Sequence, residues 1–244
     1  MKDCKSIKIM GIDVDAVTKA EVLAYFDDYL SEDRCHHIIT LNPEMILEAQ
    51  TNSGFKELLS EADLKFPDGI GLVYASRIVG EPLTERVTGI DFANDALIRL
   101  AETGKTAYFF GSKPGIAELA AKNMEEKIPG LKVAGFHDGY FKPEAESAII
   151  EEINASGADM LLLGLGSPKQ EFFVQKYKDA LKPKVAVGIG GSFDVWSGTL
   201  KRAPKFYIDH NIEWLYRLIQ EPSRIKRMSK LPAFLIKVAG YKEE

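Results

Sequence analysis

Residues 158–168 read ADMLLLGLGSP, and this stretch indicates the fold class. An apolar run without polar alternation is typical of a strand in the middle of a sheet whose two faces are both covered. The glycines, serine and proline that follow are residues that end a strand and turn the chain. We therefore expect a central strand, then a tight turn, then a helix that runs to Tyr177.

Units of the same kind lie on both sides of this stretch. Short apolar runs alternate with longer segments of helical periodicity, which is the pattern of βαβ units. Further strands are expected at residues 6–12, 36–41, 64–66, 105–110, 133–136 and 185–191. Helices are expected at residues 18–30, from residue 44 onward, at 116–128 and at 209–220. The sequence thus predicts a Rossmann-like α/β fold, a mostly parallel sheet covered by helices on both faces, with a C-terminal helical appendage.

Charge is distributed unevenly along the 244 residues, whose net charge is −5. Residues 201–244 hold ten Lys or Arg against five Asp or Glu, so the remaining 200 residues are strongly acidic. We interpret residues 1–200 as one α/β domain and residues 201–244 as a basic, amphipathic helical appendage. A basic segment on an acidic body suggests that the appendage faces something anionic.

Composition excludes several classes of protein. With 45% hydrophobic residues, the chain has too much apolar content for disorder. Its two cysteines, Cys4 and Cys35, are too few for a disulfide framework or a cysteine-rich zinc site, so a cytosolic setting is expected. No signal peptide is visible, and the longest apolar stretch, Met160–Gly166, is far shorter than the ~20 residues that span a bilayer. We therefore do not expect an integral membrane protein.

Two glycine-rich turns follow predicted strands, at residues 111–115 and 164–168. Backbone N–H groups and helix dipoles at such turns favour anions, so Gly111, Gly164 and Gly166 are candidates for contact with a phosphate or nucleotide. Neither turn is a dinucleotide fingerprint or a P-loop, since Lys169 stands where a third glycine would be required. Each turn taken alone could equally be one that needs small residues. Their repetition along one sheet edge favours a nucleotide-type ligand.

Polar residues close two other strands. Asp68 follows a strand and could act as a general base toward a substrate hydroxyl, or could be an aspartate that forms a turn before glycine. Thr40 and Asn42 offer neutral hydrogen-bonding groups, with a cap for the following helix as the alternative. Gln170 and Glu171 begin a helix; capping accounts for the glutamate well and for the glutamine poorly.

Metal binding and covalent catalysis are not expected. Asp13-x-Asp15 superficially matches the D-x-D of metal-dependent sugar transferases, but Asp15 is better explained as a turn or cap residue. The four histidines lack the spacing of metal ligands, and His36 and His37 are adjacent in a strand and point to opposite faces. No nucleophile elbow is present, so we predict no metal and no cofactor.

Arginines in the appendage form the last candidate group. Arg217, Arg224 and Arg227 carry guanidinium groups, which match phosphate oxygens well. The alternatives are a solvated helix face or nonspecific attraction to an anionic surface. Nucleic acid is a weaker interpretation, because aromatic residues are not interleaved with the basic ones.

The chain resembles the TagA/WecG family of bacterial glycosyltransferases. The resemblance is carried by short fragments that occur in the family's order along nearly the whole sequence. The matching fragments are Thr40-x-Asn42-x-Glu44, Pro67-Asp68-Gly69-x-Gly71, Glu85-Arg86-Val87-Thr88-Gly89, Gly111-x-x-Pro114-Gly115, His137-x-Gly139-Tyr140-Phe141, Gly164-x-Gly166-x-Pro168-x-Gln170-Glu171, Gly190-Gly191-x-Phe193-Asp194, Arg202-Ala203-Pro204, Glu213-Trp214-x-x-Arg217-Leu218, Glu221-Pro222-x-Arg224 and Arg227. Asn211-Ile212 and Phe172-Phe173 depart from the family pattern, which affects how finely a donor sugar can be assigned.

The resemblance implies an inverting, metal-independent transfer of N-acetylmannosamine (ManNAc) from UDP-ManNAc. The implied acceptor is the N-acetylglucosamine (GlcNAc) of undecaprenyl-diphosphate-GlcNAc, in wall teichoic acid linkage-unit synthesis at the cytoplasmic face of the membrane. It further implies Asp68 as the base and a polar pocket that contains Thr40, Asn42 and Gln170. The family's C-terminal arginines map to Arg217, Arg224 and Arg227, of which we expect Arg217, Arg224 or both to stabilise the departing UDP.

Several alternatives remain open from the sequence. The donor could be the UDP-linked uronic acid of ManNAc, or the chain could be a non-catalytic membrane adaptor that binds a nucleotide sugar. A dehydrogenase is disfavoured by the missing glycine fingerprint. The appendage could lie on an anionic bilayer and fold over the site there, making the protein peripheral to the inner membrane face. Its apolar stripe could equally support contacts in a homo-oligomer.

Overall fold

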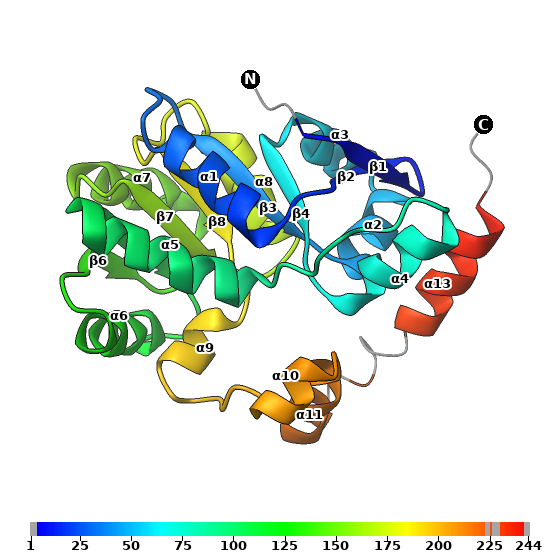
Figure 1. Cartoon of the computed structure of the whole chain (residues 1–244). Coiled ribbons are helices and arrows are strands. Elements are labelled where there is room, and N and C mark those ends of the chain that lie inside the picture. Colours follow the sequence, from blue (N-terminus) through cyan, green and yellow to red (C-terminus); the bar gives the residue numbers. More distant parts are fainter. Residues whose placement is uncertain (1–3, 223–224, 226–229, 242–244) are drawn as a thin grey trace.

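A six-stranded parallel sheet forms the centre of the computed structural model, which describes residues 4–222, 225 and 230–241 (Figure 1). The strand order is β4-β3-β8-β7-β5-β6, and every neighbouring pair runs parallel. The strands are β3 (His36–Leu41), β4 (Leu64–Pro67), β5 (Thr106–Gly111), β6 (Lys132–His137), β7 (Met160–Gly164) and β8 (Val185–Gly188). The predicted α/β class is confirmed, and so is the central place of residues 160–164.

Helices cover both faces of this sheet because side chains alternate along each strand. Met160 and Leu162 of β7 enter one core, whereas Leu161 and Leu163 enter the core on the opposite face. The first face is covered by α1 (Lys19–Tyr29), α5 (Gly89–Thr103), α6 (Ile116–Lys127) and α9 (Ser192–Trp196). The other face is covered by α7 (Glu146–Ala155), preceded by the short helix η1 (Pro143–Ala145), and by α8 (Lys169–Tyr177).

A third core lies against β3 and joins the two ends of the chain. It contains side chains from α2 (Pro43–Ala49), α3 (Ser53–Glu61), α4 (Ile70–Ile78) and α13 (Lys230–Gly240). Phe234 and Val238 of α13 are buried there, and Figure 1 shows this helix beside α4 and near the N-terminal strands. Gly71 allows the close approach, since a Cβ at this position would lie 2.5 Å from Leu231 Cδ1.

The N-terminal segment corrects one expectation. Residues 6–12 are not one strand but the first part of an antiparallel hairpin, β1 (Ser6–Ile9) and β2 (Ile12–Asp15). Met10 and Gly11 form its turn, both with positive φ, as a two-residue hairpin requires. Methionine is not a residue that signals such a turn. Asp15 is neither a turn residue nor a cap, because its Oδ2 accepts a hydrogen bond of 2.6 Å from the backbone N–H of Lys65.

A second correction concerns the expected helix at residues 209–220. The structure has two helices instead, α10 (Lys205–Asp209) and α11 (Glu213–Gln220). Asn211 separates them with a φ of +59°, a left-handed conformation that asparagine tolerates better than most residues. The break turns α11 so that Glu213 is buried while Ile219 is exposed.

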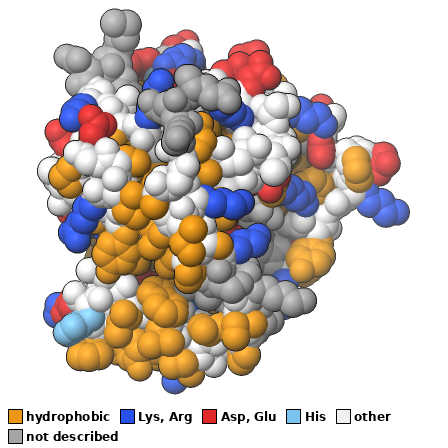
Figure 2. All heavy atoms as spheres, turned by 90° about the vertical axis from the view of Figure 1, so that its right-hand side faces the viewer, with side chains coloured by type: hydrophobic (Ala, Val, Ile, Leu, Met, Phe, Trp, Pro, Cys, Tyr) orange, Lys and Arg blue, Asp and Glu red, His pale blue; other side chains and the backbone are white. Residues whose placement is uncertain are grey.

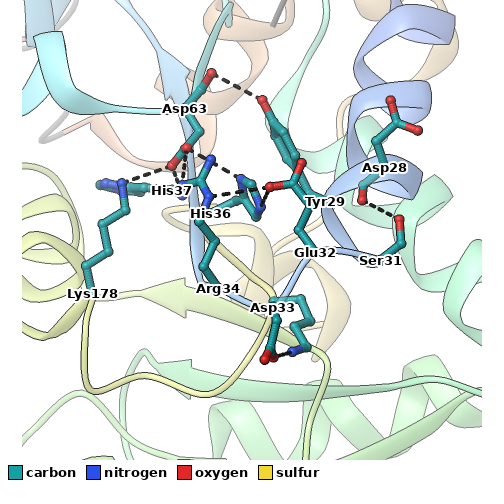
Figure 3. Close-up of polar contacts among 11 residues, drawn as sticks. Asp28, Tyr29, Ser31, Glu32, Asp33, Arg34, His36, His37, Asp63 and Lys178 are labelled. Atoms are coloured by element: carbon teal, nitrogen blue, oxygen red, sulfur yellow. Dashed lines mark hydrogen bonds and ion pairs between the residues drawn. The ribbon is translucent and has the colours of Figure 1, made fainter. Parts of the chain in front are cut away.

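Polar side chains gather at the amino end of the sheet, around Asp63 (Figure 3). The Asp63 carboxylate accepts hydrogen bonds from the backbone N–H of His37 at 2.8 Å and from Lys178 Nζ at 3.0 Å, and it pairs with Arg34 Nη1 at 2.6 Å. The ring of His36 is fully buried and stacks on Tyr29. In the parts of the chain that the structure describes, no helix is both long and apolar enough to cross a membrane.

Candidate functional site

The carboxyl ends of β3 and β8 border the main crevice of the sheet. From β3 the chain moves outward to β4 on one side and then crosses to β5 on the other, so the connections diverge at this point. Ligands of open α/β sheets bind at such a position. A cavity of about 870 Å³ lies here. Its lining includes Thr40, Asn42, Asp68, Ser112, Lys113, Tyr140, Lys142, Gly164, Gly166, Lys169, Gln170, Ile189, Asp194 and Arg217.

The two glycine-rich turns shape this larger cavity in different ways. Gly164 and Gly166 line it directly, and their contact with a phosphate or nucleotide stays a prediction. Gly111 lies against Gly164, and a Cβ there would be 2.5 Å from the Gly164 carbonyl carbon. The turn after β5 instead brings Ser112 and Lys113 to the cavity, and the Ser112 hydroxyl donates to Asp194 Oδ1 at 3.1 Å.

Thr40 and Asn42 both lie at this edge and both have structural partners. The Thr40 hydroxyl donates to the Gly188 carbonyl at 3.0 Å, which links the ends of β3 and β8. Asn42 caps α2, since its Oδ1 accepts from the N–H groups of Glu44 and Met45 at 3.0 and 3.1 Å. Capping therefore holds for Asn42, and the same residue lines the cavity.

Gln170 is held in a fixed orientation within the larger cavity. Its Oε1 accepts from the Gly166 N–H at 3.2 Å, and its Nε2 donates to Glu171 Oε1 at 2.8 Å. Gly188 makes room for the amide, because a Cβ there would lie 2.1 Å from Gln170 Nε2. Burial raises the pKa of Glu171 above its ordinary value, while hydrogen bonds to its carboxylate oppose the shift. These contacts fix the amide of Gln170 toward the cavity wall.

A smaller cavity of about 250 Å³ adjoins the first one. It lies between the start of α4, residues 86–90, α11 and the start of α13. Its lining includes Pro43, Ile70, Gly71, Arg86, Thr88, Ile90, Glu213, Trp214, Lys230 and Leu231. Asn42, Asp68, Ile189 and Arg217 line both cavities. Asp68 therefore lies at the junction of a polar cavity and a more apolar one.

Asp68 combines this position with an altered acidity. Its backbone N–H donates to the Leu41 carbonyl at 2.7 Å, which fixes the residue directly after β4. Burial raises the pKa of the Asp68 carboxyl, and the charges of Arg86 and Arg217 and the Gly89 N–H only partly oppose this. The carboxylate lies against Gly89, where a Cβ would be 3.3 Å from Asp68 Oδ2. A carboxylate with a raised pKa is a better proton acceptor, as a general base requires.

Arg86 and Glu213, to which the sequence motifs assign no role, line the smaller cavity together with Asp68. Arg86 Nη2 is 3.1 Å from Glu213 Oε2, and Arg217 Nη2 is 3.1 Å from Glu213 Oε1. Both residues belong to fragments of the family resemblance, and that was their only signal in the sequence. Their pairing spans 127 positions, so spacing could not reveal it.

The remaining predicted site residues stand as follows. Arg217 lines both cavities, whereas Arg224 and Arg227 lie outside the residues that the structure describes. Over residues 4–222, 225 and 230–241, no group of three or more His, Cys, Asp or Glu is arranged to hold a metal ion. Metal independence of the reaction stays a prediction.

Known proteins resemble this chain over most of its length. Residues 7–244 match the family described as "Glycosyl transferase WecG/TagA/CpsF family". The chain is 40% identical over 210 residues to the N-acetylglucosaminyldiphosphoundecaprenol N-acetyl-beta-D-mannosaminyltransferase of Bacillus spizizenii strain W23, which covers 86% of this chain and 81% of that protein. A protein of the same name from Bacillus subtilis strain 168 is 34% identical over 221 residues, covering 88% and 86% of the two chains. These matches confirm the resemblance carried by the sequence motifs: the chain belongs to the WecG/TagA/CpsF family of glycosyl transferases.

Proposed function

We propose that this glycosyl transferase moves ManNAc from UDP-ManNAc to the GlcNAc of undecaprenyl-diphosphate-GlcNAc, with inversion at the transferred carbon. The names of its two Bacillus relatives support the acceptor and the transferred sugar. The position of Asp68 at the junction of the two cavities is the observation that carries the proposal. A base at a junction can act on an acceptor in one cavity while the donor occupies the other.

The larger cavity suits the nucleotide-sugar donor. Lys113, Lys142 and Lys169 line it, and the backbone turns at Gly164 and Gly166 open into it. Lysines and exposed backbone N–H groups attract a diphosphate. Arg217 would neutralise the charge that develops on the departing UDP, and Arg224 is proposed for the same task.

The smaller cavity suits the acceptor sugar. Trp214, Ile70 and Leu231 give it apolar walls, and it adjoins the start of α13. In the proposed step, the acceptor hydroxyl oxygen forms a bond to C1 of ManNAc as the bond from C1 to the UDP oxygen breaks. The hydroxyl proton passes to the carboxylate of Asp68, and the electron pair of the broken bond leaves with UDP. One displacement from the side opposite to UDP inverts the configuration at C1.

A membrane contact fits the lipid-linked acceptor. Figure 2 shows the face that carries α13 and, below it, α10–α11, and apolar side chains gather there. Among the described residues of 205–241, the exposed large apolar side chains are Phe206, Trp214, Ile219, Ile225, Ile236 and Tyr241. Lys230 and Lys237 of α13 add positive charge, which favours an anionic lipid surface. We place the enzyme at the cytoplasmic face of the membrane, in wall teichoic acid synthesis.

The transfer is tested by measuring UDP release and product mass with UDP-ManNAc and a soluble lipid-diphosphate-GlcNAc. We expect Asp68→Asn to lower kcat by about 10²–10⁴-fold, because the acceptor hydroxyl loses its base. Asp95→Asn is the matched control, since this carboxylate of α5 pairs with Lys19 of α1, away from both cavities. Parallel reactions with the UDP-linked uronic acid of ManNAc distinguish the alternative donor. Full activity of Asp68→Asn would contradict the proposed role of Asp68.

The membrane contact is tested by co-sedimentation with vesicles rich in phosphatidylglycerol. Ile236→Glu places a charge on a residue that is 73% exposed on α13, so we expect weaker binding with unchanged folding. Leu119→Glu, on the exposed side of α6, is the control and should bind like the parent. A deletion of residues 200–244 would be a poorer test, because it also removes the buried Phe234. Equal binding of the parent and Ile236→Glu would exclude this surface.

A further inference from the structure

One buried carboxylate connects two arginines beside the proposed base. Glu213 is the first residue of α11 and is only 4% exposed. One of its oxygens is bound to Arg86, from the segment that precedes α5, and the other to Arg217, one turn along α11. Asn211 also contacts Arg86, because its Oδ1 accepts a hydrogen bond of 3.4 Å from Arg86 Nη1. Glu213, Arg86 and Arg217 thus join α11 to the sheet domain at the point where both cavities meet.

The two arginines differ in how firmly the rest of the protein holds them. The side chain of Arg86 is 17% exposed, whereas that of Arg217 is 38% exposed. A long side chain that is partly in water has many rotamers, and a carboxylate four residues earlier on the helix selects among them. Glu213 is therefore the contact that ties Arg217 to the inner, better packed arginine.

A role for Glu213 as a second base does not fit this arrangement. Each of its oxygens already receives a guanidinium N–H, so both oxygens are engaged within the protein. Its charge acts instead on the neighbours. Burial is the main cause of the raised pKa of Asp68; the charges of Arg86 and Arg217 oppose this shift, and the charge of Glu213 adds to it.

We propose that Glu213 is a positioning residue for the transfer: its carboxylate, bound to Arg86 on one oxygen, holds Arg217 with the other at the junction of the two cavities. This inference rests on the proposed function, in which Asp68 is the base and Arg217 faces the departing UDP. A second consequence follows for Asp68. Because Glu213 engages both guanidinium groups, neither arginine is left to close an ion pair on the base.

The test is a double-mutant cycle of Glu213 and Arg217, read out as kcat and KM in the UDP-release assay. Glu213→Gln keeps the size of the side chain but loses the charge that holds both arginines. We expect kcat to fall by roughly 10²-fold, the cost of a misplaced catalytic group, with KM for UDP-ManNAc changed much less. In the Arg217→Ala background, the same change should cost less than about threefold, because the residue through which it acts is gone.

The pH dependence supplies a readout that a merely structural role would not move. Freed arginines can pair with Asp68, so Glu213→Gln should lower the pKa of the base and shift the acid limb of kcat/KM to lower pH. Glu213→Asp keeps the charge and should recover part of kcat. Asp209→Asn, which removes an exposed ion pair with Lys205 on neighbouring α10, is the matched control and should leave kcat and the acid limb unchanged.

Each outcome decides the proposal. Effects of Glu213→Gln and Arg217→Ala that multiply independently, or an unshifted acid limb, would overturn it. Should Glu213→Gln fail to fold, as a thermal melt would reveal, Glu213→Asp takes its place in the same cycle: its shorter side chain cannot reach both guanidinium groups, and its smaller loss of kcat should likewise disappear in the Arg217→Ala background. Loss of activity in Asp68→Asn together with an additive cycle would reject only the role of Glu213. Full activity of Asp68→Asn would reject the function on which that role rests.

Discussion

Asp63 and Asp68 flank the same strand, β4, and each lies near two cations, yet their acidities move in opposite directions. Burial alone would raise the pKa of Asp63, but bonds from the His37 N–H, Lys178 and Arg34 hold it below its ordinary value (Figure 3). At the other end of the strand, burial raises the pKa of Asp68, and the nearby arginines do not reverse the shift. Folding thus lowers the pKa of one aspartate and raises the pKa of another that lies five positions later in the sequence.

The difference lies in where the cations are bound. Arg34 and Lys178 both make direct contact with the carboxylate of Asp63. Arg86 and Arg217 instead form their ion pairs with Glu213, so they act on Asp68 through their charge and not through hydrogen bonds. A buried carboxylate that is fully paired stabilises the fold, and one whose cations are held by a third group stays available for chemistry. Each end of β4 offers a way to test this comparison.

The largest effect on the free energy of unfolding is expected for Asp63, whose carboxylate is paired with two cations. Asp63→Asn leaves Arg34 and Lys178 without their carboxylate, and we expect a loss of about 2 kcal/mol, below the 3–5 kcal/mol of a fully buried pair because Arg34 is about half exposed. For a chain of this size the melting midpoint would fall by about 4–8 °C. Thermal melts followed by circular dichroism measure this change.

The pH dependence of that loss has a defined sign. A carboxyl whose pKa is lowered by folding stabilises the protein above its unfolded pKa, and this stabilisation disappears as the pH falls through the folded pKa. Melts of Asp63→Asn and the parent should therefore differ most near neutral pH and converge in acid. Asp33→Asn is the control, because its partner Lys184 forms an ion pair at the exposed surface. A neutral-pH midpoint like that of the parent would break the comparison.

A smaller change of the melting midpoint, with the opposite sign, is expected for Asp68 at the other end of β4. A carboxyl whose pKa is raised by folding destabilises the folded state increasingly as the pH rises from its unfolded pKa through its folded pKa, since the buried charge lacks full compensation. Asp68→Asn should accordingly raise the melting midpoint near neutral pH, by less than Asp63→Asn lowers it, while abolishing most turnover. The gain should vanish as the pH falls below the unfolded pKa, where the parent carboxyl is protonated in both states. A midpoint that Asp68→Asn lowers at pH 7 would show that the ionised group is fully paired.

Much of the fold could be predicted because it depends on local patterns. The apolar strands, the turns after them and the polar residues at their carboxyl ends were identified from short stretches, and parallel topology then brings those ends together. Asp68, Thr40, Asn42, Gln170, Gly164 and Gly166 meet at one edge for this reason. The role of each residue in the transfer remains a prediction.

The features that could not be predicted depend on distant partners or on unusual backbone. Met10 and Asn211 adopt left-handed conformations that their residue types do not demand, so the hairpin and the break before α11 had no clear signal. The bond between Arg86 and Glu213 exists only once α11 has docked. The apolar residues of α13 have a helical pattern, but no pattern states that they return to the core beside β3.

The return of α13 to that core has a consequence for folding kinetics. Ile7 and Ile9 share a core with Phe234 and Val238, which lie more than 220 positions later in the sequence. Contacts between such distant residues form slowly, because the entropy of closing the intervening loop is lost before the contact stabilises the chain. Leu231, which lines the smaller cavity, lies on the same helix. We therefore expect the smaller cavity to be completed late in folding, after the more local contacts have formed.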